Sequence, residues 1–347
     1  MISVQGLSKR YGDFSAVVGS DFEVASGEVF GVVGPNGAGK TTTLKILSGL
    51  IEPSAGTATV AGYDVTEPAM RSTLGFLPEE SPLYEDMTPL SYLHFFADLY
   101  DVPREVATDR IDASLSRLEL EHRTRRLGDT SKGMKRKVAI ARSLINDPEV
   151  LIYDEPASGL DPLTTNEVLR FVAELADEGK TVLFSAHNLY HVEDICDRVI
   201  VMIDGEVVAR GTVSEIRATH GTTEYHVYTT VPVEEKTTDS SRSSGNQLDG
   251  ESETDPETEA DAGAGTALDD GTPNPAPPMR NGAAATTVTE EGSTERYETV
   301  VPDMAAVEEL RERASAAGGE VVDIRTVEPS FEEIFLDIAR PSAGAGS

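Results

Sequence analysis

The stretch Gly34-Pro-Asn-Gly-Ala-Gly-Lys-Thr41 decides the fold class, because it matches the phosphate-binding pattern Gly-x4-Gly-Lys-Ser/Thr. The apolar run Val29–Val33 precedes it, and leucines at helical spacing follow it, which predicts the strand–loop–helix setting that this pattern requires. Glycines let backbone N–H groups surround phosphate oxygens, and the helix N-terminus adds positive potential. We therefore expect Lys40 to reach the β- and γ-phosphates of a nucleotide and the Thr41 hydroxyl to bind Mg²⁺.

Two carboxylates follow a second apolar run. Val150–Tyr153 predicts a buried strand, and Asp154 and Glu155 come directly after it. A carboxylate at the end of a parallel strand beside the phosphate loop can hold Mg²⁺, and the next one can polarise the attacking water. We expect Asp154 to bind the metal and Glu155 to act as the general base; a pair of charges at a helix N-terminus is the alternative interpretation.

A third segment, Thr130–Lys137, places a hydroxyl residue and a glycine before a helix-forming run, which makes another candidate anion-binding helix N-terminus. Here the chain resembles the ATP-binding-cassette family, whose signature is usually written Leu-Ser-Gly-Gly-Gln. The chain keeps the signature residues Ser131 and Gly133 and differs at the other three positions. Such Ser-Lys-Gly-Met variants are similar to those of a subgroup that serves exporters. The resemblance implies that Ser131 and Gly133 engage ATP held by a second ATP-binding subunit, either an identical copy or a paralogue.

The resemblance covers about residues 1–220 and includes the D-loop-like segment Ser158–Asp161. It implies that His187 contacts the γ-phosphate and that Tyr11 stacks on adenine. Two plainer interpretations stay open: Tyr11 as an ordinary strand tyrosine, and His187 with His191, four residues later, as a metal-binding pair on a helix.

Glu79 departs from the family pattern. A glutamine that touches Mg²⁺ and the permease usually begins the linker to the helical subdomain, and in Gly75–Glu79 that place holds a glutamate. A glutamate can still bind Mg²⁺ while adding a charge near the phosphates. The expected metal ligands are Thr41, Asp154 and Glu79, and the expected nucleotide-binding residues are Tyr11, Gly34, Pro35, Asn36, Gly37, Ala38, Gly39, Lys40, Thr41, Thr42, Ser131 and Gly133.

The organisation of the chain predicts an α/β fold with more than one part. Residues 1–220 alternate short apolar strands with amphipathic helices, which is typical of a mainly parallel sheet covered by helices; within them, the resemblance implies a helical subdomain near 80–145. Residues 234–295 have too few large apolar residues to form a core, so we predict a disordered acidic insertion. On either side of it, residues 221–233 and 296–340 predict a small C-terminal α/β accessory domain.

The charge is strongly acidic, with 61 acidic residues, 8 lysines and 21 arginines among the 347 residues. Residues 234–296 carry a net charge of −11 out of the total of −32, so the excess is distributed over the whole chain. An acidic surface repels phosphate backbones, which argues against nucleic acid as a partner. The scarcity of lysine in an acidic chain favours adaptation to high salt, where screening suppresses self-repulsion.

No apolar run approaches the roughly 18 residues that a membrane-spanning helix needs, no export signal is evident, and the single cysteine excludes an internal disulfide. We expect a cytoplasmic location, peripheral at the inner face of the cell membrane, because the resemblance implies an integral membrane permease encoded separately. The predicted function is ATP hydrolysis that drives this permease, with export favoured. The alternative is a mechanical ATPase that acts on ribosomes or DNA, although the chain has one cassette and no sustained heptads.

Overall fold

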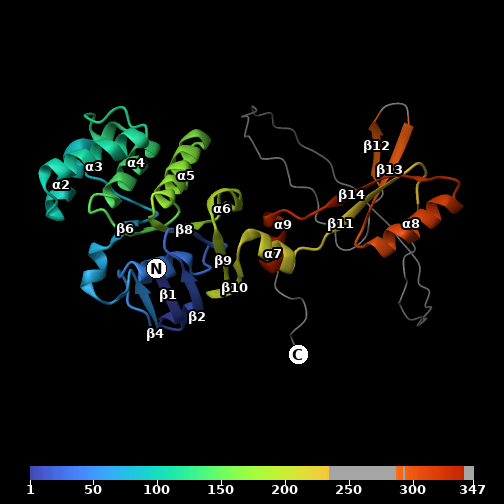
Figure 1. The fold of residues 1–347 in the computed structure, drawn as a ribbon, viewed down its shortest axis with the longest axis horizontal. Coiled ribbons are helices and arrows are strands. Elements are labelled where there is room, and N and C mark those ends of the chain that lie inside the picture. The colour runs from blue at the N-terminus through green and yellow to red at the C-terminus, as the bar shows by residue number, and fades with distance from the viewer. Residues whose placement is uncertain (234–286, 292–293, 340–347) are drawn as a thin grey trace, which may run out of the picture. The chain divides into compact units, whose positions relative to one another are not determined.

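The computed structural model describes residues 1–233, 287–291 and 294–339 (Figure 1). Contacts divide the chain into two units. The first contains Met1–Thr222 together with the segment from Glu328 onward, and the second contains Thr223–Val327. An α/β fold was predicted, and the first unit confirms it.

A six-stranded, mainly parallel sheet forms the centre of the first unit. Its strands, in spatial order, are β10 (Glu206–Gly211), β9 (Arg198–Ile203), β3 (Val29–Val33), β8 (Thr181–Ala186), β7 (Val150–Tyr153) and β6 (Leu74–Leu77). All neighbours pair in parallel except β10, which is antiparallel to β9. The register pairs Val33 with Ala186 and Tyr153 with Phe184. The carboxyl ends of β3, β7 and β8 therefore meet at one edge of the sheet.

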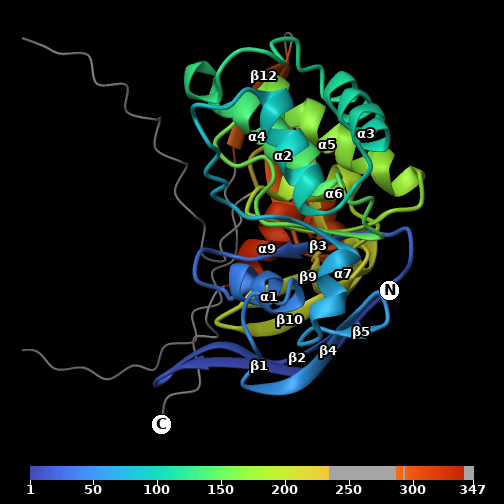
Figure 2. The ribbon, with the colours of Figure 1, turned by 90° about the vertical axis from the view of Figure 1, so that its left-hand side faces the viewer.

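An antiparallel sheet and one helix cover one face of the central sheet. The strands are β2 (Phe14–Val24), β1 (Ile2–Tyr11), β4 (Ala55–Val60) and β5 (Tyr63–Asp64), and the helix is α1 (Lys40–Leu47). Leu44 and Leu47 of α1 pack in a common core with Phe30 and Val32 of β3 and with Ile152 of β7. In Figure 2, α1 lies between β3 and the antiparallel strands β1, β2 and β4. Val29 and Val33 of the same strand belong to a second core on the opposite face of the sheet. The side chains of β3 therefore alternate between the two faces.

Helices cover the second face. They are α2 (Pro89–Leu99), α3 (Arg104–Arg117), α4 (Lys132–Ser143), α5 (Pro162–Asp177), α6 (Leu189–Ile195) and α7 (Val213–His220), with short 3₁₀ turns η1 (Pro68–Ser72) and η2 (Leu127–Asp129) elsewhere in the unit. Thr88, Ser131 and Asp161 cap α2, α4 and α5, each accepting a hydrogen bond from the N–H three residues later. In Figure 2, α2, α3 and α4 lie together on the side of the central sheet away from β1, β2 and β4, within the expected helical range 80–145. Within the described residues, no helix combines the length and the apolar character that crossing a membrane requires.

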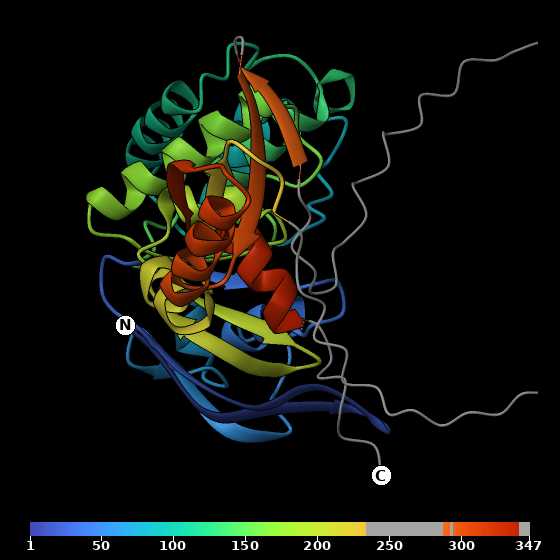
Figure 3. The ribbon, with the colours of Figure 1, turned by 90° about the vertical axis from the view of Figure 1, so that its right-hand side faces the viewer.

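The second unit is an antiparallel sheet with one helix on it. The strands, in spatial order, are β12 (Thr287–Glu291), β13 (Thr294–Val301), β11 (Glu224–Thr229) and β14 (Val321–Val327), and the helix is α8 (Met304–Ala316). Val307, Leu310 and Ala314 of α8 pack against Val227 and Val301 of the sheet. Figure 3 shows this unit from the side of its helix. This unit is the small C-terminal domain that the predicted fold class included.

Strand β12 corrects one expectation. Residues 287–291 belonged to the predicted disordered insertion 234–295, yet they form a strand that pairs antiparallel with β13, from Thr287 opposite Glu298 to Glu291 opposite Thr294. The composition argument failed here because ladder hydrogen bonds to β13 satisfy this backbone without a large apolar side chain. Residues 234–286 and 292–293 lie outside the described residues.

The position of the last helix, α9 (Phe331–Ala339), also differs from the expected domain boundary. Residues 296–340 were expected in the accessory domain, whereas α9 belongs to the first unit. Phe331 and Ile334 are each only 1% exposed, since they pack into the core of the first unit beside α6 and α7. The physical reason is that the apolar face of α9 packs against α6 and α7 of the first unit.

Candidate functional site

The phosphate-binding loop connects β3 to α1 at the carboxyl edge of the central sheet. Gly39 immediately precedes α1 and has φ +97°, in the left-handed region. A Cβ at Gly39 would lie 2.3 Å from the carbonyl oxygen of Ala16, so the position requires a glycine for space as well as for conformation. The loop therefore has the compact backbone that the sequence pattern predicted.

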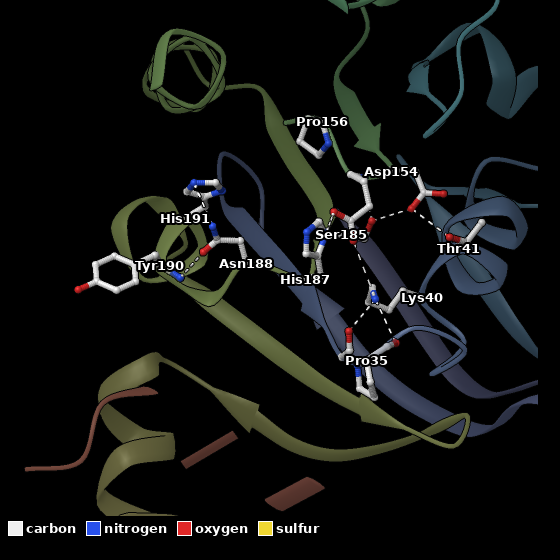
Figure 4. Close-up of polar contacts among 12 residues, drawn as sticks. Pro35, Lys40, Thr41, Asp154, Pro156, Ser185, His187, Asn188, Tyr190 and His191 are labelled. Atoms are coloured by element: carbon white, nitrogen blue, oxygen red, sulfur yellow. Dashed lines mark hydrogen bonds and ion pairs between the residues drawn. The ribbon is translucent and has the colours of Figure 1, made fainter. Parts of the chain in front are cut away.

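Lys40, the first residue of α1, is a buried cation held by the loop. Its Nζ donates hydrogen bonds to the carbonyl oxygens of Gly34 at 2.6 Å and Pro35 at 3.2 Å, and it lies 3.9 Å from Oε1 of Glu155 (Figure 4). Burial lowers the pKa of Lys40, and the neighbouring carboxylates, first of all Glu155, oppose that shift. An ammonium so placed can exchange these acceptors for phosphate oxygens of a nucleotide.

Asp154 lies next to Thr41, although 113 positions separate them along the chain. Its Oδ1 accepts hydrogen bonds from Oγ of Ser185 at 2.6 Å and from Oγ1 of Thr41 at 3.2 Å. A hydroxyl and a carboxylate are the hard oxygen donors that Mg²⁺ prefers, with phosphate oxygens and waters as further ligands. The donor set therefore fits the expected metal, and the parallel register of β3, β7 and β8 explains why these residues meet.

Glu155 has an unusual backbone conformation, with φ +48°. Its N–H donates to Oγ of Ser185 at 2.9 Å, and its Oε2 lies 2.7 Å from Nδ1 of His187. Figure 4 shows the side chains of His187, Ser185 and Lys40 around this position. The carboxylate thus lies between the loop lysine and a histidine, a position that is compatible with the expected general base. Sequence reasoning missed Ser185, whose signal was a polar residue within the fully buried strand β8.

A cavity of about 490 Å³ lies over the loop. Glu79, Glu155 and His187 line it, and so do Phe14 and Ala16. The expected loop residues that line it are Pro35, Asn36, Gly37, Ala38, Gly39, Lys40, Thr41 and Thr42. The predicted phosphate, base and histidine residues therefore share one cavity.

Tyr11 lies close to this cavity but does not line it. It ends β1 opposite Phe14, which begins β2 and does line the cavity. The Tyr11 ring is 49% exposed, and Nζ of Lys9 lies 5.2 Å from its centroid. Two exposed aromatic rings are thus available where the base of a nucleotide would extend from the loop.

Ser131 and Gly133 lie at the start of α4, and neither lines the cavity over the loop. Ser131 is exposed and accepts a hydrogen bond from the N–H of Met134 at 3.2 Å. A Cβ at Gly133 would lie 3.0 Å from Cγ2 of Thr164 on α5, so this glycine permits close packing of the two helices. Within one chain, therefore, the structure does not bring Ser131 and Gly133 to the cavity over the loop.

His191 lines a neighbouring cavity of about 210 Å³ together with His187. Burial lowers the pKa of His191, and the charge of His187 lowers it further. Among the residues that the structure describes, no cluster of three or more His, Cys, Asp or Glu side chains could hold a metal ion. Nothing in the described part of the chain therefore favours the interpretation of these two histidines as a metal pair.

Arg136, within the segment Thr130–Lys137, was not among the expected site residues, yet its side chain contacts the main chain of Asp154 and Glu155. It lies on α4, is 7% exposed and donates hydrogen bonds to main-chain carbonyl oxygens beside the carboxylates. Burial lowers the pKa of Arg136 to about 10. The sequence spacing could have indicated that Arg136 is buried. Ala139 and Ile140 lie three and four positions after it, and Ser143 lies one turn further on the same buried face of the helix.

The fold and this cavity define a phosphate-loop nucleotide hydrolase. A family model described as "ABC transporter" matches residues 17–158. The chain is 41% identical over 224 residues to the ABC transporter ATP-binding protein NatA of Bacillus subtilis (strain 168), which covers 62% of this chain and 91% of that protein. The chain therefore belongs to the ATP-binding ATPase subunits of the ABC transporter family.

Two further similarities concern other members of the family. The daunorubicin resistance ATP-binding protein DrrA3 of Streptomyces coeruleorubidus is 41% identical over 223 residues, which cover 63% of this chain and 71% of that protein. A solved dimeric ATP-binding cassette in a post-hydrolysis state, bound to ADP and Pi, is similar with a TM-score of 0.56 and 25% identity, over 61% of this chain and 98% of that chain. The matched region corresponds in size to the first unit.

Proposed function

We propose that this chain binds ATP with Mg²⁺ in the cavity over the phosphate loop, and that hydrolysis drives a separate integral membrane permease in the direction of export. The observation that carries the proposal is the meeting of Lys40, Asp154, Glu155 and His187 at one edge of the central sheet. Phosphoryl transfer to water needs positioned cations and one base, and this edge supplies both.

Each side chain has a role that its surroundings support. Lys40 binds the β- and γ-phosphates, and Thr41, Asp154 and Glu79 hold Mg²⁺, which when bound neutralises charge on the phosphates. Glu155 accepts a proton from the attacking water, and His187, 2.7 Å from it, orients the carboxylate and reaches the γ-phosphate. Because the Glu155 carboxylate is already in hydrogen-bond contact with the histidine, little reorganisation is needed when the nucleotide binds.

A second ATP-binding subunit completes the site in this proposal. Ser131 and Gly133 lie outside the cavity of their own chain, and Ser131 is exposed, so it is accessible to ATP bound elsewhere. The similar dimeric cassette supports a pairing of two such subunits. The partner is an identical copy or a paralogue, because every expected catalytic side chain is present here.

The relatives' names support a transport role. One relative is an ATP-binding protein for daunorubicin resistance, which favours export as the direction. The permease would dock near Glu79–Met87 and the helical subdomain, where Tyr84 and Phe95 are exposed with ring centroids 5.9 Å apart. The chain would accordingly work in the cytoplasm, peripheral at the inner face of the membrane, and without nucleic acid.

Co-purification with a permease tests this function. The permease encoded beside this chain should retain it in washed membranes and should raise its ATPase rate in proteoliposomes. The Lys40→Ala variant is the control, since it should still bind the permease without hydrolysing ATP. Retention on ribosomes or DNA instead, with no stimulation by any membrane protein, would favour the mechanical ATPase.

The two exposed aromatic residues give a matched pair for the adenine site. We expect Tyr11→Ala to raise the Kd for ATP about tenfold, since stacking of an aromatic ring on a base contributes ~1–3 kcal/mol. Phe14→Ala, at the position opposite Tyr11 in the strand pair, should change it less than threefold. Titration with a fluorescent ATP analogue measures both. The reverse order would assign the stacking to Phe14, which lines the cavity.

A further inference from the structure

All five N–H groups of the Arg136 guanidinium have main-chain acceptors. Nε donates to the carbonyl oxygen of Pro156 at 2.8 Å, and Nη1 donates to those of Pro78 at 2.7 Å and Glu79 at 2.9 Å. Nη2 donates to those of Asp154 at 2.8 Å and Glu155 at 2.6 Å. A guanidinium has five N–H donors in a planar fork, so this set is complete.

The five carbonyl oxygens belong to two loops. Pro78–Glu79 follow β6, and Asp154–Pro156 follow β7, which is the parallel neighbour of β6. Arg136 itself lies on α4, five residues after the helix cap Ser131. The Arg136 side chain therefore joins three parts of the structure: the loop with the expected metal ligand Glu79, the loop with the expected base Glu155, and the helix α4, which begins after Ser131. These contacts fix the three parts relative to one another.

The link to Glu155 is direct. A glutamate at φ +48° is in a conformation that residues other than glycine adopt at a cost, so surrounding contacts must hold it there. Its N–H is held by Ser185 and its carbonyl oxygen by Arg136. Removing the second contact would free the carbonyl side of Glu155 and loosen the backbone that directs its carboxylate toward His187.

The direct contacts of Arg136 fix geometry, because all five N–H groups donate to main-chain carbonyl oxygens. The charges of Asp154, Glu79 and Glu155 act in addition and favour the cationic form of this buried side chain. A lysine would keep the positive charge but offers three donors on a single nitrogen, which cannot reach two loops in a planar fork. Replacing Arg136 by lysine therefore removes the hydrogen-bond geometry while it keeps the positive charge.

We propose that Arg136 is a positioning residue for ATP hydrolysis, which holds the backbone of Glu155 and Glu79 in register with the signature helix α4. This inference rests on the proposed function, because it assumes that Glu155 is the base. It also means that a shift of α4, when Ser131 engages ATP of the second subunit, changes the aim of Glu155. Hydrolysis would thus depend on the position of the signature helix.

The test separates binding from turnover in the full-length protein. Arg136→Lys should lower kcat at least about 30-fold, because a misplacement of about 1 Å at a reacting group can cost about 100-fold. The Kd for ATP should stay within about threefold of the wild type, since Lys40 and the phosphate loop are unchanged. Arg142→Lys is the matched control on the same helix, where the guanidinium donates to the Tyr92 hydroxyl at 2.9 Å; its kcat should stay within about twofold.

Chemical rescue gives an independent readout. In Arg136→Ala, millimolar methylguanidinium should restore part of kcat, whereas methylammonium at the same ionic strength should not. A kcat of Arg136→Lys within threefold of the wild type, or a parallel loss of ATP affinity and kcat, would overturn the inference. If Arg136→Ala does not fold, the separation of kcat from Kd in Arg136→Lys decides alone. Failure of the wild type to hydrolyse ATP would instead refute the proposed function.

Discussion

Replacing Glu155 by glutamine should lower kcat for ATP hydrolysis by at least about 100-fold, while the Kd for ATP stays within about threefold of the wild type. Glutamine has the shape of glutamate but cannot accept a proton from water. The neighbours that place the residue, Ser185 on its N–H and Arg136 on its carbonyl oxygen, contact the backbone and are unaffected. Release of phosphate and equilibrium binding of ATP, measured on the same sample, give the two values.

Two further variants are needed to interpret the result for Glu155→Gln. Lys40→Ala should abolish productive ATP binding, because it removes the buried ammonium of the phosphate loop. Glu149→Gln makes the same chemical change at an exposed position immediately before β7 begins. It should leave kcat and the Kd for ATP unchanged. Near-normal hydrolysis by Glu155→Gln would show that another group is the base.

ATP should convert the Glu155→Gln variant from a monomer into a dimer, because nucleotide that is bound but not hydrolysed keeps the two subunits closed on each other. Adding Ser131→Arg should prevent this conversion, since a long side chain at the exposed cap of α4 would exclude ATP of the partner. Light scattering with and without ATP measures the mass directly.

A control distinguishes the interface from general effects of charge. Ala113→Arg places the same side chain at an exposed position on α3 and should leave the dimer intact. Equal dimerisation of the Ser131→Arg double variant would mean that the signature residues do not act across the interface. The base assignment would survive that outcome, because it depends on Glu155 alone.

Local patterns indicated which loops meet beside the cavity over the phosphate loop. The apolar runs before Gly34 and Asp154 indicated neighbouring parallel strands, and parallel strands bring their following loops to one edge. The contact between Glu155 and His187 follows from the same register. The predicted helical subdomain also corresponds to α2, α3 and α4. Adaptation to high salt stays a prediction.

The remaining features depend on partners that are distant in the sequence. Arg136 contacts Pro78, 58 positions away, and Ser185 contacts Asp154, 31 positions away, so neither bond leaves a local periodicity. The same limitation explains the domain boundary. The apolar residues of α9 follow helical spacing, but this periodicity cannot tell which of two cores the helix joins.

Helix α9 sets the order in which this protein can mature during synthesis. The ribosome releases the N-terminal part first, and residues 1–222 already contain every proposed nucleotide-site residue. Phe331 and Ile334 emerge only after the whole second unit, so the apolar surface beside α6 and α7 must stay open, and available to chaperones, until then. A protein truncated after Thr222 would leave this apolar surface exposed and would tend to aggregate. Fusing residues 328–339 after Thr222 should cover the surface again and restore solubility.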